Sequence, residues 1–126
     1  MSGATYDAGA LIAAERSSEA MWAYHRRLLS NGIRPSCSAA VLGQVWRGGP
    51  QARLSQFLRG CRIVPLDEEQ ARVAGAVLER SGTEDLIDAV VVVGALERGG
   101  PLVTSDPEDM RRIARAVDRQ LSLHVV

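Results

Sequence analysis

Residues 84–109 read EDLIDAVVVVGALERGGPLVTSDPED, and this stretch decides the fold. Its apolar centre is too long for a single strand and predicts a helix, which the glycine pair at 99–100 ends. Residues 101–104 follow as a short buried strand, and Asp106 with Pro107 predicts the capped start of another helix. The order helix, tight turn, strand, helix indicates an α/β fold.

The rest of the chain alternates strands and helices in the same way. Strands are expected at 4–6, 33–37, 62–66 and 121–126, and helices at 9–15, 19–30, 39–47, 51–59, 68–80 and 107–117. We therefore predict one domain over residues 1–126, with a three-layer α/β/α arrangement around a mainly parallel sheet.

Composition excludes several classes of protein. Fifteen basic residues balance fifteen acidic ones, so net charge gives no indication of a nucleic-acid partner. Every basic residue is arginine, which excludes chemistry that requires a lysine. The sequence has neither a long apolar run nor a signal-like start, so we expect a cytoplasmic protein without a membrane segment. Cys37 and Cys61 stand isolated and are expected as reduced core residues.

Carboxylates stand where predicted strands lead into helices: Asp7, Asp85 with Asp88, and Asp106 with Asp109. Taken singly, each is explained as an N-cap or as a favourable charge in a first helical turn. Taken together at the carboxyl end of a parallel sheet, they would repel one another and raise their pKa values unless a cation lay between them. Mg²⁺ or Mn²⁺ suits such oxygen ligands and can drive phosphoryl displacement through a bound water.

Other chemistries lack their residues. His25 lies on an apolar helix face and is expected in the core, and His124 is remote from the acids. The chain has no Gly-x-Ser-x-Gly, no phosphate-binding glycine loop and no Gly-x-Gly-x-x-Gly, which disfavours nucleophilic hydrolases and dinucleotide-binding domains. A phosphoacceptor receiver domain normally needs a lysine beside its Asp, and the chain has none.

Two parts of the chain resemble the signatures of PIN-domain ribonucleases. DAVVVVGAL at 88–96 with GGPLVTSD at 99–106 is similar to the C-terminal signature, and YDAGALIA at 6–13 resembles the N-terminal one. The resemblance covers essentially the whole chain, and the length is similar to that of VapC-type toxins of bacterial toxin–antitoxin pairs. It implies a PIN-like fold and a Mg²⁺- or Mn²⁺-dependent endoribonuclease, usually a homodimer, that a small cognate antitoxin neutralises.

The resemblance also implies roles for individual acids. Asp7 matches the first acid of the family pattern, Asp88 the third and Asp106 the fourth, and all three would be catalytic metal ligands. Asp109 matches a frequent additional acid beyond them. Asp85, one helical turn before Asp88, either faces the same cleft or only caps its helix.

The sequence departs from the family pattern at the second acid. The family has Glu on the helix after the second strand, and this chain has Gln44 there. A glutamine keeps an acceptor oxygen but removes one negative charge and cannot act as a base, so metal affinity is expected to fall. Two interpretations stay open: an active metal-dependent ribonuclease, and a weak or inactive PIN-fold module that recognises RNA or a protein partner.

Arg16, Arg47 and Arg53 are the candidate RNA contacts, because guanidinium groups bind phosphates through paired hydrogen bonds. The alternative for each is a solvated charge on a helix surface. Trp22 and Trp46 are expected in the core rather than on RNA.

Overall fold

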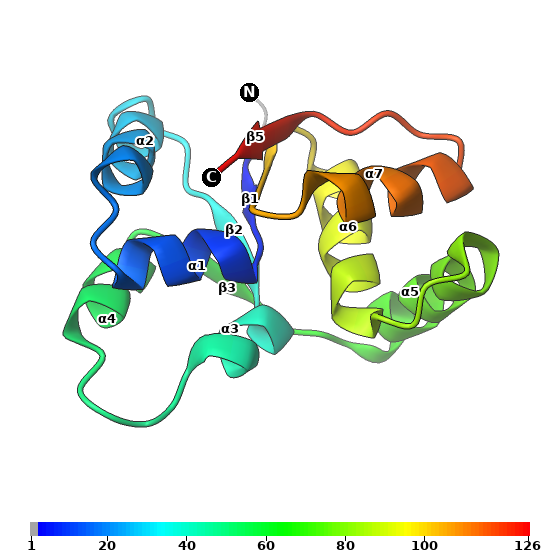
Figure 1. Ribbon diagram of the computed structural model, residues 1–126, viewed down its shortest axis with the longest axis horizontal. Helices are drawn as coiled ribbons and strands as arrows, with labels where there is room; N and C mark the ends of the chain where they lie inside the picture. The colour runs from blue at the N-terminus through cyan, green and yellow to red at the C-terminus, as the bar shows by residue number, and fades with distance from the viewer. Residues whose placement is uncertain (1–2) are drawn as a thin grey trace.

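Residues 3–126, the part of the chain that the computed structural model describes, form a five-stranded parallel sheet between two groups of helices (Figure 1). In chain order the elements are β1 (Thr5–Tyr6), α1 (Ala8–Glu15), α2 (Glu19–Ser30), β2 (Ser36–Ser38), α3 (Ala39–Val45), α4 (Ala52–Leu58), β3 (Arg62–Val64), α5 (Glu68–Ser81), α6 (Leu86–Arg98), β4 (Leu102–Thr104), α7 (Pro107–Ala116) and β5 (Leu123–Val125). Every neighbouring pair of strands is parallel. The predicted three-layer α/β/α class is confirmed.

The strand order is β3-β2-β1-β4-β5, so the direction in which the chain builds the sheet reverses between β1 and β4. Helices α1 to α4 lie on one side of the sheet, and α5 to α7 lie on the other (Figure 1). Open α/β sheets bind ligands beside the carboxyl ends of the strands at such a reversal. Asp7 directly follows β1 and Asp106 closely follows β4, so the topology brings both residues to this place.

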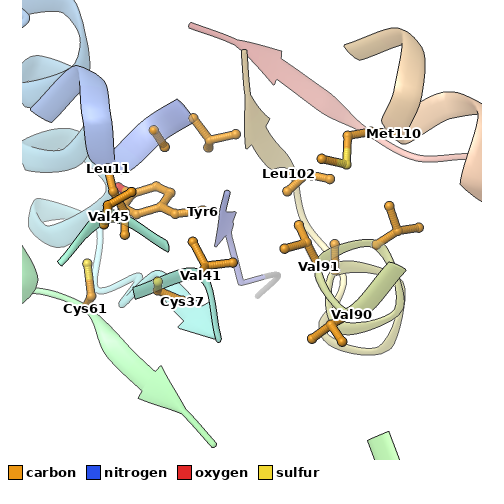
Figure 2. Packing of buried hydrophobic residues seen from close by; sticks show 14 of the residues in the cluster. Tyr6, Leu11, Cys37, Val41, Val45, Cys61, Val90, Val91, Leu102 and Met110 are labelled. Atoms are coloured by element: carbon orange, nitrogen blue, oxygen red, sulfur yellow. The ribbon is translucent and has the colours of Figure 1, made fainter. Parts of the chain in front are cut away.

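Hydrophobic side chains fill the space on both sides of the sheet. Tyr6 and Leu11 lie in the half covered by α1 to α4, and Val91 and Met110 lie in the half covered by α5 to α7 (Figure 2). Helix α6 is buried along its middle from residue 89 to 95, which explains its uninterrupted apolar sequence.

Several predicted element ends differ from the structure: for example, the strand expected at 33–37 spans Ser36–Ser38, and the strand expected at 121–126 spans Leu123–Val125. The helix expected at 39–47 stops at Val45, because Trp46 adopts an extended conformation and begins the connection to α4. Trp46 is 42% exposed, so its predicted place in the core is wrong. The strand expected at 62–66 ends at Val64, just before Pro65, whose nitrogen cannot donate a hydrogen bond to a neighbouring strand.

The other core predictions are confirmed. Trp22 is buried, and its indole nitrogen donates to the carbonyl of Ala14 at 2.9 Å. Cys37 and Cys61 are buried free thiols. His25 is also buried, with its Nδ1 at 2.8 Å from the hydroxyl of the core tyrosine in β1. Over residues 3–126, no helix is long and apolar enough to cross a membrane.

Candidate metal centre at the carboxyl edge of the sheet

Asp7 lies between the start of α1, which donates a hydrogen bond to it, and the end of β4. Its Oδ1 accepts the N–H of Ala10 at 3.0 Å, which caps α1, and only 5% of the residue is exposed. Burial raises the pKa of Asp7, while hydrogen bonds from the Thr104 side chain and from the backbone of Ala10, Gly9 and Ser105 oppose this rise. Asp7 therefore caps α1, as its position before a predicted helix indicated. It is also tied to the segment that follows β4.

Asp88 carries the largest electrostatic perturbation among the acids. It lies in the first turn of α6, and its N–H donates to Oδ1 of Asp85, the helix cap, at 3.0 Å. Burial raises the pKa of Asp88 to about 7, and the negative charges of Asp85, Asp106, Asp7 and Asp109 raise it in the same direction. Coulombic effects weaken with distance and screening, so these four carboxylates lie near enough to Asp88 for their charges to act on it.

Asp106 occupies the N-cap position of α7, but its side chain does not cap that helix. Its N–H instead donates to the Thr104 hydroxyl oxygen at 2.9 Å. A side-chain hydrogen bond with Asp109 is the main cause that raises the pKa of Asp106, followed by burial and by the charges of Asp109 and Asp7. The predicted capping role of Asp106 is therefore wrong. Its carboxyl group is exposed and makes no cap hydrogen bond to α7.

Asp109 lies beside Asp106 on the first turn of α7. Its Oδ1 is 3.7 Å from Nη2 of Arg112, and both side chains are substantially exposed, so this ion pair contributes little to stability. The place of Asp109 in the first turn of α7 suits both roles: a charge that complements the helix dipole, and an additional acid near Asp106.

The carboxylates gather without forming a ready-made cage. Within residues 3–126, no three His, Cys, Asp or Glu side chains are arranged to hold a metal ion as they stand. Mg²⁺, however, usually takes only one or two carboxylates and keeps several water ligands. Carboxylates that raise one another's pKa values repel one another, and a hydrated cation would balance their negative charge. The residues therefore fit a hard divalent cation bound partly through water.

Gln44 lies on α3, which contacts α6, the helix that carries Asp88. It is exposed, whereas its neighbour Val45 packs into the core. In the described chain its side chain forms no hydrogen bond with any of the acids. The helix thus presents a neutral polar group where the sequence pattern leads us to expect a carboxylate.

Two of the three candidate RNA-binding arginines have structural contacts of their own. The guanidinium carbon of Arg53 lies 4.2 Å from the ring centroid of Trp22, and its Nε donates to the Ser17 hydroxyl at 3.2 Å. Arg47 donates from Nη1 to the carbonyl of Trp46 at 2.8 Å. These contacts explain both side chains without an RNA ligand.

Arg16 is placed differently. It lines a cavity of about 350 Å³ together with Gly9, Ile12, Ala13, Ser105 and Val126. Gly9, Ile12, Ala13 and Arg16 share one face of α1, at the spacing of successive helical turns. Two lining residues of the cavity, Gly9 and Ser105, are close in the chain to Asp7 and Asp106. Arg16 also lines the cavity but lies at the far end of α1. Of the three arginines, Arg16 alone lines this cavity.

The residues that sequence reasoning missed are Thr104 and Ser105. Both lie close enough to Asp7 to lower its pKa, and the Thr104 hydroxyl also accepts from the backbone N–H of Asp106, so this segment adjoins both acids. The only signal in the sequence was their position between a predicted strand and an acid.

Comparison with known proteins supports the fold described above. A family model described as PIN domain matches residues 5–116. The chain is similar to VapBC2 from Rickettsia felis bound to a DNA fragment from their promoter, with 18% identity, 98% of each chain covered and a TM-score of 0.76. No curated protein matches the chain.

Two further solved structures share the fold. FitAB bound to a DNA fragment is 16% identical, with 97% of this chain and 94% of that chain covered and a TM-score of 0.65. PAE2754 from Pyrobaculum aerophilum is 17% identical, with 97% and 83% covered and a TM-score of 0.61.

Proposed function

The chain belongs to the PIN-domain family, and we propose that it is a Mg²⁺- or Mn²⁺-dependent endoribonuclease, the toxin of a bacterial toxin–antitoxin pair. The observation that carries this proposal is that burial, together with the charges of Asp85, Asp106, Asp7 and Asp109, raises the pKa of Asp88 to about 7. Carboxyl groups whose pKa values are raised destabilise the folded protein when they ionise, unless a bound ligand balances their charge. A divalent cation is the ligand that this donor set suits.

Asp7, Asp88 and Asp106 would hold the ion, and Asp85 and Asp109 would add negative charge around it. When bound, the ion supplies a water of lowered pKa and stabilises the charge that develops on a phosphate. Asp7 keeps its position because the side chain is buried and its Oδ1 accepts the N–H of Ala10. Asp106 is free to turn toward the ion because its side chain does not cap α7.

The RNA substrate would lie along the cavity on α1. Arg16 at its far end would bind a phosphate and position the strand, and the small Gly9 and Ser105 would let the backbone of the RNA approach Asp7 and Asp106 closely. Contacts of this type fix the strand without reading its sequence.

Partners follow from the resemblance to VapC-type toxins. A small cognate antitoxin would cover the acidic cleft, and two copies of the chain would form a homodimer in the cytoplasm. The similarity in fold to VapBC2 and FitAB supports a toxin–antitoxin setting.

An RNA cleavage assay across a Mn²⁺ titration tests the proposal. The purified wild type is expected to cut RNA in a Mn²⁺-dependent manner, and Asp88→Asn is expected to abolish the cutting. Residual cutting that is equal in Asp88→Asn would show that a contaminating nuclease produced the signal. No cutting by the wild type at any Mn²⁺ concentration would reject the nuclease proposal for the natural chain.

Gln44 supports one alternative, a PIN-fold module that binds RNA or a protein partner without cutting. It removes the negative charge expected at the second position and leaves α3 with a neutral side chain beside α6. If the wild type is inactive and Gln44→Glu cuts RNA, the binding module is the correct description and the lost charge is its cause.

A further inference from the structure

The opposite edge of the sheet, where the strands begin, contains a polar cavity of about 290 Å³. Three arginines line it: Arg34 just before β2, Arg62 at the start of β3 and Arg98 at the end of α6. They come from three separate parts of the chain, so only the fold brings them together. The acids that follow β1 and β4 lie at the other edge of the same sheet.

Arg98 is held in place by packing around its guanidinium. Its Nη2 donates to Oγ1 of Thr5 at 3.1 Å, whereas its Nε is buried and has no hydrogen-bond partner within the described chain. Gly94, one turn earlier on α6, makes room for this arrangement, because a Cβ there would lie 2.6 Å from Nη2 and 3.1 Å from Cζ. The helix therefore keeps a glycine where the guanidinium folds back against the sheet.

The other two arginines are exposed at the mouth of the cavity. Nη2 of Arg34 donates to the carbonyl of Cys61 at 3.1 Å, which directs the side chain toward the start of β3. Arg62 lies close enough to Arg98 for its charge to lower the pKa of Arg98, although burial is the larger cause. A guanidinium stays protonated despite such shifts, so the cavity carries three positive charges.

These charges lack acidic partners at the cavity. No Asp or Glu lines it, and the salt bridges found over residues 3–126 involve none of the three arginines. Glu97 raises the pKa of Arg98, but it is an exposed residue on α6 that does not line the cavity. The carbonyls at the end of α6 add only a partial negative charge. The cavity therefore has an excess of positive charge.

We propose that Arg34, Arg62 and Arg98 form a binding site for a phosphate group at the amino edge of the sheet. Guanidinium groups match the oxygens of a phosphate through paired, charge-assisted hydrogen bonds. The volume lies at the lower end of the range for small-ligand sites, which suits a phosphate with its bridging waters or the phosphate end of a larger molecule. The site uses none of the acids, so it stands independently of the nuclease proposal.

Isothermal titration calorimetry with inorganic phosphate, at constant ionic strength and with EDTA present, tests the proposal. We expect saturable binding to the wild type, with affinity reduced by about tenfold or more in Arg62→Gln and Arg98→Gln. Gly94→Ala keeps every charge but displaces the Arg98 guanidinium, so it should also weaken binding. The matched control Arg72→Gln alters an exposed arginine on α5 and should leave the affinity unchanged.

Arg62→Gln keeps the test valid if loss of the partly buried Arg98 impairs folding, because Arg62 is exposed. The proposal is overturned if phosphate up to about 10 mM gives no saturable binding. Equal affinity in Arg62→Gln and Arg72→Gln also overturns it. Parallel titrations with a nucleoside 5′-monophosphate and a short RNA identify the source of the phosphate, because the true source binds most tightly and loses affinity in Arg62→Gln.

Discussion

Gly9 at the start of α1 lies directly against Ser105 in the segment between β4 and α7. A Cβ on Gly9 would stand 2.7 Å from the Cβ of Ser105 and 3.0 Å from its backbone nitrogen. The φ angle of Gly9 is not positive, so the requirement is for space rather than for a special backbone conformation. Asp7 and Asp106 flank this contact along the chain, so a change at Gly9 is expected to move the two carboxylates relative to each other.

Gly9→Ala is therefore expected to separate the two carboxylates and to weaken Mn²⁺ binding and RNA cleavage by about tenfold or more, since small displacements at reacting groups are costly. Calorimetric titration with Mn²⁺ measures the first effect. Gly75→Ala is the matched control, because a Cβ there meets nothing within 4 Å. It should leave Mn²⁺ binding intact and add up to about 1 kcal/mol of stability on α5. Wild-type Mn²⁺ affinity in Gly9→Ala would show that the contact does not set the site.

The raised pKa of Asp88 predicts how stability depends on pH in the absence of metal. Its pKa in the folded state, about 7, exceeds its ordinary value of 3.8, so the folded state holds the proton more tightly than the unfolded state. The contribution of Asp88 to stability is therefore present below its ordinary pKa and is lost as the pH rises toward about 7.

Asp88→Asn should remove this loss and stabilise the metal-free protein at about pH 8 by roughly 1–2 kcal/mol, a figure discounted because the group is only partly buried. Urea denaturation with EDTA at about pH 5 and about pH 8 measures the difference between the two proteins. The same carboxylate predicts that Mn²⁺ affinity of the wild type rises as the pH increases through about 7. A variant that is no more stable than the wild type at the higher pH would contradict this electrostatic assignment.

Gln44→Glu should restore a negative charge on α3 and tighten Mn²⁺ binding by on the order of tenfold, because ligand charge governs the affinity of oxygen sites for divalent cations. Cleavage of RNA should rise in parallel. Gln56→Glu makes the same chemical change on the exposed surface of α4 and serves as the control. If both variants bind Mn²⁺ with the same affinity, position 44 does not belong to the metal centre.

Arg16 and Arg53 should respond differently to the same substitution. Arg16→Gln is expected to weaken binding of RNA in EDTA and to reduce the slope of log affinity against log salt by about 1, as expected for one lost phosphate contact. Arg53→Gln should instead lower stability, because it loses the stacking on Trp22 and the bond to Ser17. Fluorescence anisotropy and thermal unfolding separate the two effects. An unchanged salt slope in Arg16→Gln would remove this residue from the RNA path.

Much of the fold could be predicted from the sequence because its signals are local. The glycine pair at 99–100, the apolar run of α6 and the cap at Asp85 each act within a few residues, and the structure has the corresponding elements. Strand ends were less predictable, since they depend on pairing between distant segments. Trp46 was misplaced because the side chain of a residue just beyond a helix no longer follows the helical period.

The site was predictable only in outline. The position of each acid at a strand end indicated one edge of the sheet, and the observed strand order brings β1 and β4 together there. Whether Asp106 caps its helix depends on its dihedral angles and on Thr104, which no spacing reveals. The cavity lined by Arg34, Arg62 and Arg98 was likewise beyond prediction, because its walls come from separate elements.

A crystal structure of the protein soaked with Mn²⁺, with the ion located by its anomalous scattering, tests the central claim most directly. We predict one strong peak at the carboxyl edge of the sheet, in contact with Asp88 and with Asp7 or Asp106, and partly surrounded by water. No peak at saturating Mn²⁺, or a peak only at a place remote from these carboxylates, would contradict it.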